Sequence, residues 1–209
     1  DLIVTTPVRQ LVDDTVVAMM GANTSVWMKE ELFQRTGSFK PRGALLNVLA
    51  LDPGQLRRGI CAISAGNHAV ATAYAARQAG THAKVVMIAT ANPFRVALCR
   101  AWGAEVEFAA DAHEGFERVE ELSRSEGRAL IHPFEGPLTA LGTATLGLEF
   151  MEQAPGLEAV VVPIGGGGLC AGVAAAVKRV NPACAVFGVE PEGADSMHRS
   201  FAAGRPESI

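Results

Sequence analysis

The chain has 209 residues, 49% of them hydrophobic and 19% charged, and its formal net charge is −4. This length allows one large domain or two small ones with an ample apolar core. The acidic balance and the lack of a basic stripe argue against nucleic-acid binding, and Gly, Pro or charged residues interrupt the apolar stretches too early for a membrane span.

Short β-branched segments alternate with longer amphipathic segments, and this alternation is typical of an α/β fold with parallel strands. In chain order, strands are predicted at residues 26–30, 60–64, 84–88, 105–108, 129–131, 159–163 and 185–189. Helices are predicted at residues 39–50, 67–79, 93–102, 112–126, 141–153, 169–179 and 194–203. Residues 59–136 are expected to form a compact small lobe, and residues 1–58 and 137–209 a large lobe.

The cysteines Cys61, Cys99, Cys170 and Cys184 show no C-x-x-C spacing. Cys61 and Cys170 lie in apolar segments, where a free thiol usually packs as a small hydrophobic group. The start of the chain also lacks the pattern of a secretory signal. Together these features favour a reduced protein in the cytoplasm.

A run of glycines, Gly165, Gly166, Gly167 and Gly168, follows the apolar strand predicted at 159–163 and precedes a predicted helix. Without Cβ atoms, successive backbone N–H groups can converge on one anion, and the helix N-terminus adds partial positive charge. A phosphate monoester fits such a site. No Lys-Ser or Lys-Thr pair follows the glycines, so the loop is not a P-loop, and a flexible turn is the alternative interpretation.

A second loop, Ser64-Ala65-Gly66-Asn67-His68, also lies between a predicted strand and a predicted helix. It combines a helix N-terminus with a hydroxyl, an amide and an imidazole, and this combination suits a substrate carboxylate. An ordinary helix cap made by the serine or the asparagine would explain the same residues.

Lys40 lies near the start of the helix predicted at 39–50, behind a turn that contains Gly37. The positive end of a helix lowers the pKa of an amine there, which favours a neutral nucleophile; an ordinary surface lysine is the alternative. Loops that follow parallel strands gather at the carboxyl ends of the sheet, so the amine and the two anion sites are expected together. Pyridoxal phosphate joins an aldehyde for the amine to a phosphate, and it is the cofactor that these loops indicate.

Together these motifs resemble the fold-type II pyridoxal-phosphate enzymes, and among them the serine/threonine dehydratase (threonine ammonia-lyase) family. The resemblance extends from about residue 6 to about residue 195. It implies a two-lobed α/β fold of the tryptophan synthase beta-like type with parallel twisted sheets. Family members continue well past Ile209, so the C-terminal part of the large lobe, with the residue that faces the pyridine nitrogen, is expected to be missing.

The resemblance also implies a role for each matched residue. Lys40 would form the Schiff base with the cofactor and later remove the substrate Cα proton. The cofactor ring would pack beside Phe39, and its 3′-oxygen would bond to Asn67. Backbone N–H groups would hold the phosphate at Gly165, Gly166, Gly167, Gly168 and Leu169. The substrate carboxylate would be received by Ser64, Gly66, Asn67 and His68.

The implied reaction eliminates water and then ammonia from L-threonine or L-serine to give a 2-oxo acid, in a homodimer or higher homo-oligomer. Racemases of this family carry serine at the position of Ala65, and alanine has no proton to donate. Elimination is therefore favoured over serine or aspartate racemisation. An incomplete or inactive cofactor-binding relative is a third possibility, because the C-terminal part is missing. The segment 141–145 departs from the usual Ala-Gly-Gln-Gly-Thr, which leaves the substrate open.

No metal ion is assigned. Some relatives bind a divalent cation through two carboxylates and a backbone carbonyl; Glu190 and Ala194 match this set, but Ser196 stands where an acid is expected, and Asp195 is one position away. Such cations prefer several oxygen ligands. The remaining histidines lack ligand spacing and are interpreted as ordinary surface or core residues: His82, His113, His132 and His198.

Overall fold

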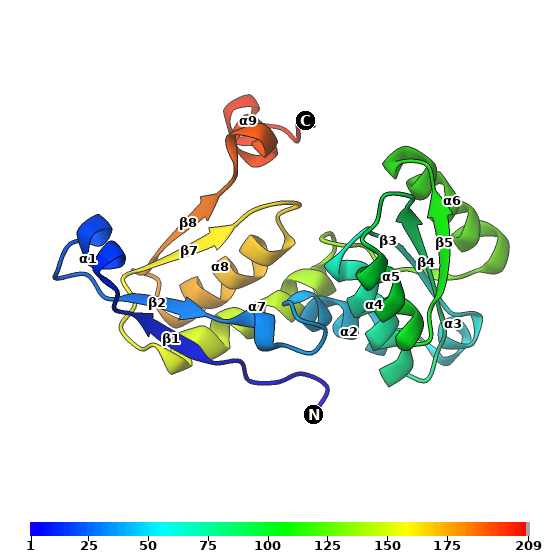
Figure 1. The fold of residues 1–209 in the computed structure, drawn as a ribbon, viewed down its shortest axis with the longest axis horizontal. Coiled ribbons are helices and arrows are strands. Elements are labelled where there is room, and N and C mark those ends of the chain that lie inside the picture. Colours follow the sequence, from blue (N-terminus) through cyan, green and yellow to red (C-terminus); the bar gives the residue numbers. More distant parts are fainter. Residues whose placement is uncertain (208–209) are drawn as a thin grey trace.

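The structure, a computed structural model, describes residues 1–207. Its strands are β1 (Val8–Leu11), β2 (Val26–Lys29), β3 (Ile60–Ile63), β4 (Ala83–Ile88), β5 (Glu105–Ala109), β6 (Ala129–Leu130), β7 (Ala159–Pro163) and β8 (Ala185–Val189). Its α-helices are α1 (Asp14–Met20), α2 (Lys40–Leu49), α3 (Pro53–Arg58), α4 (Asn67–Gln78), α5 (Pro93–Ala101), α6 (Ala112–Glu126), α7 (Pro137–Gln153), α8 (Gly168–Val180) and α9 (Ser196–Ala203). The elements form two lobes that meet at α2, α4 and α7 (Figure 1).

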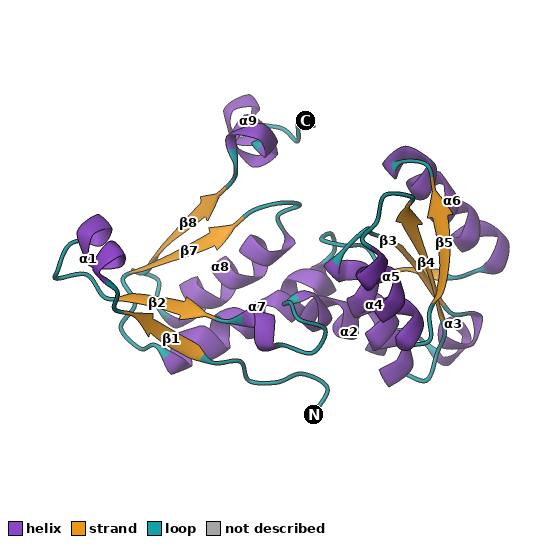
Figure 2. Ribbon diagram, in the orientation of Figure 1, coloured by secondary structure: helices purple, strands orange, loops and turns teal. Residues whose placement is uncertain are grey.

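The small lobe is built on a parallel sheet with the strand order β5-β4-β3-β6. β3 is buried along its whole length, as expected for a central strand with helices on both faces. Ile60 and Val85 pack in the cluster that includes α4 and α5, whereas Cys61 and Val86 pack against α6. The sheet therefore has helices on both faces, with α4 and α5 on one and α6 on the other (Figure 2).

The large lobe contains the parallel pair β7–β8, the antiparallel pair β1–β2, and the helices α7 and α8. The two helices approach very closely. A Cβ on Gly147 would lie 2.8 Å from the Cβ of Ala176, and a Cβ on Gly172 would lie 2.1 Å from the hydroxyl of Thr143. These glycines are needed because the helices pack backbone against backbone, and this packing places the N-terminus of α8 beside α7.

The predicted α/β fold with a parallel sheet is confirmed, and each predicted strand and helix is present. α7 begins at Pro137, one turn earlier than predicted. β2 pairs antiparallel with β1, in a two-stranded sheet separate from the parallel ones. β1, α1 and α3 were not predicted, because such short elements carry little periodicity. The division into lobes at residues 59 and 136 stays a prediction, although the four-stranded sheet falls between those residues.

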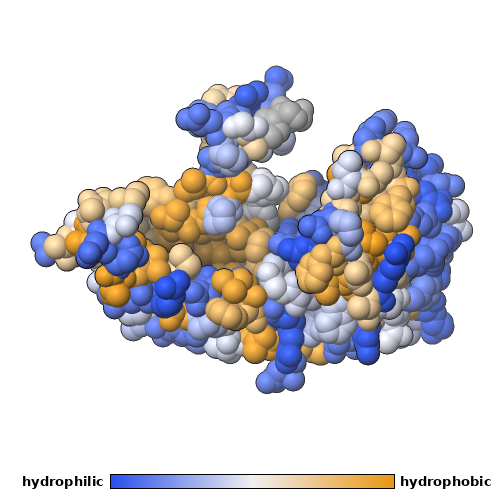
Figure 3. Space-filling model, in the orientation of Figure 1, coloured by the Kyte–Doolittle hydropathy of each residue, from blue (hydrophilic) through white to orange (hydrophobic). Residues whose placement is uncertain are grey.

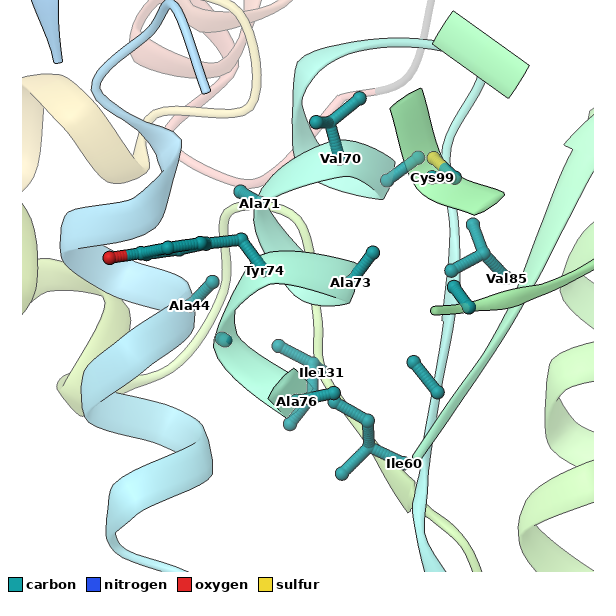
Figure 4. Packing of buried hydrophobic residues seen from close by; sticks show 14 of the residues in the cluster. Ala44, Ile60, Val70, Ala71, Ala73, Tyr74, Ala76, Val85, Cys99 and Ile131 are labelled. Atoms are coloured by element: carbon teal, nitrogen blue, oxygen red, sulfur yellow. The ribbon is translucent and has the colours of Figure 1, made fainter. Parts of the chain in front are cut away.

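Tyr74 connects the small lobe to the helix that carries Lys40. Its ring points from α4 towards α2, close to Ala44 (Figure 4), and packs edge-on against Trp102 at 5.0 Å between ring centroids. Its hydroxyl donates to the carbonyl of Leu2 at 2.5 Å. The N-terminal segment, α2 and α4 are therefore held together as one packed unit.

One face of the β7–β8 pair is apolar and open. Val161, Phe187 and Val189 are 66%, 56% and 51% exposed, and apolar side chains are prominent on this part of the large lobe (Figure 3). None of the helices within residues 1–207 is long and apolar enough to cross a bilayer.

Candidate active site

Lys40 is the first residue of α2, and an unusual turn leads to it. Thr36 and Gly37 both have left-handed backbone, with φ angles of 68° and 74°. This conformation is unfavourable for a β-branched residue such as threonine. Pro41, in the first helical turn, lacks the N–H that would be free there anyway. The turn at Thr36 and Gly37 and the proline after Lys40 therefore set where α2 begins.

A buried network of charged side chains anchors the first turn of α2. The guanidinium of Arg42 is fully buried and donates to both carboxylate oxygens of Glu31 at 2.8 Å and to Glu149 at 3.0 Å. Glu149 also accepts from the amine of Lys29. Two carboxylates thus pair with two cations, and none of the four charges is buried without an opposite charge beside it. The network holds α2, β2 and α7 together only two residues from Lys40.

The Lys40 amine lies between the lobes. Its Nζ donates to the backbone carbonyl of Pro133 at 2.5 Å and lies 5.2 Å from the centroid of the Phe39 ring. Burial lowers the pKa of the Lys40 amine, which increases the fraction that is present as a neutral nucleophile. The direction of this shift is the predicted one, but its cause is burial rather than the helix N-terminus.

The loop between β3 and α4 presents polar groups at the carboxyl end of β3. Gly66 is the N-cap of α4, and within residues 1–207 no side chain caps this helix start. The hydroxyl of Ser64 accepts the N–H of Gly66 at 3.1 Å. Asn67 Oδ1 is buried and has no hydrogen-bond partner among the described residues. An unpaired buried acceptor is costly, so Asn67 Oδ1 would be satisfied by a donor that these residues do not supply.

The side chain of His68 is hydrogen-bonded to other residues of the protein. Its Nε2 lies 2.8 Å from the carbonyl of Ile131 and 3.4 Å from the hydroxyl of Thr72. Because a carbonyl only accepts, Nε2 carries the proton. Burial, partly opposed by the bond to Ile131, lowers the pKa of His68 to about 4. The ring is therefore neutral, and any help that His68 gives to a carboxylate must come from its backbone N–H.

The tetraglycine loop follows β7 and opens α8. Gly167 has a φ of 85°, and Gly168 begins the helix without a side-chain cap from the described residues. A Cβ on Gly166 would lie 2.1 Å from the ring of Phe134, and a Cβ on Gly168 would lie 2.4 Å from the carbonyl oxygen of Phe134. The hydroxyl of Thr143 donates to the carbonyl of Gly168 at 2.8 Å. The loop is thus fixed from outside, and its N–H groups stay free for an anion.

These parts meet at one pocket at the junction of the lobes. Lys40, Phe39, His68, Gly168 and Leu169 line it. The other predicted site residues do not line this pocket themselves, but they adjoin it in the chain next to His68 and Gly168: Ser64, Gly66, Asn67, Gly165, Gly166 and Gly167.

Pyridoxal phosphate would place three demands on such a pocket: an amine for its aldehyde, N–H donors for its phosphate and a polar partner for its ring oxygen. The Lys40 amine and the Cβ-free start of α8 meet the first two demands, and the side chain of Asn67, which carries an NH₂ group beside its unpartnered Oδ1, can donate to the ring oxygen. The residues present therefore fit the cofactor.

Several residues at the pocket escaped the sequence analysis. His132, Pro133 and Phe134 line it, although His132 was interpreted as an ordinary histidine. Their role depends on contacts across long sequence separations, which no local pattern reveals. The signal available was weak: a His-Pro pair directly after the strand β6, at the carboxyl end of the same parallel sheet.

Glu190, the matched residue of the metal set, caps a helix instead. Its carboxylate accepts the backbone N–H groups of Met197 and His198, both at 2.9 Å, at the start of α9. Among residues 1–207, no group of three or more His, Cys, Asp or Glu side chains has an arrangement suited to a metal ion. The structure therefore gives no reason to assign one.

Comparisons with known proteins identify the family. Residues 2–209 match the family described as "Pyridoxal-phosphate dependent enzyme", and the chain belongs to that family. It is 56% identical over 202 residues to "Phenylserine dehydratase" from Ralstonia pickettii, covering 97% of this chain and 61% of the relative. It is 40% identical over 185 residues to "L-threonine ammonia-lyase" from Thermotoga maritima, covering 88% of this chain and 46% of the relative.

Among solved structures, maize serine racemase superposes with a TM-score of 0.93 at 35% identity, covering 99% of this chain and 62% of that chain. The predicted fold-type II architecture is therefore confirmed, and so is dependence of the family on pyridoxal phosphate. The chain spans about half to three fifths of the length of the curated relatives that it matches.

Proposed function

We propose that the protein is a pyridoxal-phosphate-dependent lyase that removes water and then ammonia from a β-hydroxy amino acid and yields a 2-oxo acid. The observation that carries this proposal is the pocket that Lys40 and the start of the helix after the tetraglycine loop both line, together with His68, whose chain neighbour Asn67 has a buried Oδ1 without a partner among the described residues. The overall reaction balances, because the water lost in elimination is regained when ammonia is released.

Lys40 has two tasks in this proposal. Its amine would hold the cofactor through the aldehyde, and the same amine, when free, would remove the proton from the substrate Cα. The lowered pKa of Lys40 suits both tasks, because each needs a neutral amine. When bound, pyridoxal phosphate delocalises the negative charge that develops at Cα.

The two loops hold the remaining charges. Free N–H groups at the start of α8 bind the phosphate, with partners at Gly165, Gly166, Gly167, Gly168 and Leu169. The start of α4 receives the substrate carboxylate, with partners at Ser64, Gly66, Asn67 and His68. Phe39 packs against the cofactor ring, as its place beside the Lys40 amine suggests.

The substrate is proposed as a class, with L-threonine or L-serine as the sequence-based expectation. One relative is named for phenylserine and another for threonine, so the group on Cβ is phenyl or methyl in the substrates that name these relatives, and it would be hydrogen in L-serine. A coupled assay for 2-oxo acid with serine, threonine and phenylserine decides among them. Release of a 2-oxo acid from none of the three, with cofactor bound, would overturn the lyase proposal in favour of a cofactor-binding relative.

Racemisation is the second candidate, supported by the likeness to a serine racemase. Racemisation needs a proton donor on the face of Cα opposite Lys40, and Ala65 in the β3–α4 loop has none to give. Chiral analysis of the amino acid left after partial reaction separates the two activities. The elimination proposal expects the remaining substrate to keep its configuration.

We further propose that the protein works in the cytoplasm as a homodimer or higher homo-oligomer. Free thiols at all the cysteine positions, Cys61, Cys99, Cys170 and Cys184, support a reducing location. The oligomer is an expectation from the family resemblance. Light scattering on the full-length protein measures it directly, and a monomer at micromolar concentration would contradict it.

A further inference from the structure

A short bend formed by residues 132–135 (His132, Pro133, Phe134 and Glu135) touches both parts of the proposed cofactor site. The carbonyl of Pro133 accepts from the Lys40 amine. The ring of Phe134 covers Gly166, and its carbonyl lies against Gly168. The same few residues therefore contact the amine and the phosphate loop.

His132 holds this bend in shape. Its Nδ1 accepts the backbone N–H of Glu135 at 2.9 Å and that of Phe134 at 3.4 Å. Asn and Asp make this pattern at the first position of a turn, where proline often follows. Pro133 fixes its own φ and has no N–H to place. The imidazole also packs edge-on against the Phe134 ring at 4.6 Å.

The bend requires an unprotonated Nδ1, and the surroundings favour one. Burial lowers the pKa of His132, and the nearby Lys40 acts in the same direction. Glu135 opposes the shift, with a carboxylate oxygen 3.9 Å from Nε2. His68 on α4 also lies close enough to interact with His132, but it is neutral.

We propose that His132 is a positioning residue: by accepting two backbone N–H groups it fixes the bend whose Pro133 carbonyl holds the Lys40 amine whenever that amine is not bonded to the cofactor. During turnover the displaced amine then keeps a fixed acceptor beside the pocket. The inference rests on the proposed role of Lys40 as the cofactor lysine.

Three variants test the inference. His132→Asn keeps an acceptor at the position of Nδ1, since asparagine makes the same turn contact. His132→Leu removes the acceptor and keeps an apolar side chain of similar size. His113→Leu is the matched control, because the side chain of His113 is 85% exposed on α6.

The first measurement is made on the cofactor-free protein. Trace acetylation with acetic anhydride, followed by peptide mass spectrometry, gives the relative reactivity of each lysine. We expect Lys40 to react about fivefold to tenfold faster in His132→Leu than in the wild type, the effect of losing one ordinary hydrogen bond. His132→Asn and His113→Leu should match the wild type. Lys29, whose side chain is 4% exposed, reports general loosening and should stay unreactive.

The outcomes decide the inference in each case. Unchanged reactivity of Lys40 in His132→Leu, or a reactive Lys40 in His132→Asn, overturns it. If Lys29 also becomes reactive in His132→Leu, that variant has lost its fold and His132→Asn decides alone: wild-type reactivity supports the role, and raised reactivity rejects it.

The second measurement follows covalent capture of added pyridoxal phosphate by its visible absorbance. Capture of the cofactor, unlike acetylation, requires the amine to be held in the right place. We therefore expect capture to be about fivefold to tenfold slower in His132→Leu and to keep the wild-type rate in His132→Asn. Failure of the two proposals is distinguishable. If acetylation responds as expected but Lys40 never bonds to the cofactor, the proposed function fails and the role of His132 in holding the amine stands.

Discussion

The loops that open α4 and α8 both present backbone N–H groups at a helix N-terminus, but one loop carries polar side chains and the other consists of glycines. Both follow a parallel strand, and both leave helix N–H groups free of side-chain caps among residues 1–207. The α4 loop carries Asn67 and His68, a polar pair with defined hydrogen-bonding needs. The α8 loop carries only glycines, and its shape is set by Phe134 and Thr143 from outside.

The difference indicates a division of labour. A phosphate has several equivalent oxygens and can be held by bare N–H groups, so a loop without side chains suffices and allows close approach. A ring oxygen and a substrate carboxylate must be held in one orientation, which requires directional side chains. Lys40 lies close to both loops, so substitutions in either loop and at Lys40 separate their contributions.

The largest effect is expected at the residue that both loops serve. Lys40→Ala removes the amine for the cofactor and the base for Cα, so lyase activity should fall by about a thousandfold or more. The assay is 2-oxo acid release at saturating cofactor. Lys84→Ala is the control, because Lys84 pairs with Glu126 on the outer side of the small lobe. Retention of even a tenth of the activity would contradict the proposed role of Lys40.

Acid should weaken the protein through the polar loop and not through the glycine loop. The pKa of His68 falls from 6.5 to about 4 in the fold, so between these pH values the unfolded chain binds more protons. The free energy of unfolding should therefore drop as pH falls through this window, by about 3 kcal/mol in total. His68→Gln should flatten this dependence in urea titrations at several pH values. Equal slopes in variant and wild type would show that His68 is not buried neutral.

Filling the glycine cradle should weaken the cofactor. A Cβ on Gly168 would lie 2.4 Å from a backbone oxygen, which cannot move away easily, so Gly168→Ala should weaken pyridoxal-phosphate binding by about a hundredfold. Gly165→Ala should lose less, because its Cβ would meet nothing within 4 Å. Gly193→Ala, also in open space but outside the loop, is the control. Equal affinities for all three variants in a fluorescence titration would remove the steric argument.

The smallest effect is expected at the amide of the polar loop. Asn67→Ala removes one hydrogen bond to the cofactor but also an unpaired buried group, so affinity should fall only about tenfold. The visible absorbance of the bound cofactor should shift as well, since its ring oxygen loses a partner. A variant that binds with wild-type affinity and spectrum would exclude Asn67 from the site.

Local chemistry made much of this site predictable. Two strand–loop–helix motifs predict helix N-termini suited to anions: the four glycines and Ser-Ala-Gly-Asn-His. The parallel order of the strands predicts that the two loops meet. α6, β7 and β8 lie at their predicted bounds.

Long-range contacts lay outside such prediction. The Arg42 network joins residues more than a hundred positions apart, and the Pro133 carbonyl meets Lys40 across a separation of 93 residues. The sequence suggested the imidazole of His68 as a partner for the substrate carboxylate, but in the fold its Nε2–H donates to the carbonyl of Ile131. β1, α1 and α3, of four to seven residues, were missed.

The central claim, that Lys40 bonds to the cofactor, is tested most directly by chemical trapping. The full-length protein is incubated with pyridoxal phosphate, reduced with borohydride, digested and mapped by mass spectrometry. The account predicts a stable cofactor adduct on the peptide that contains Lys40. An adduct on Lys29, Lys84 or Lys178 instead, or none at saturating cofactor, would contradict it.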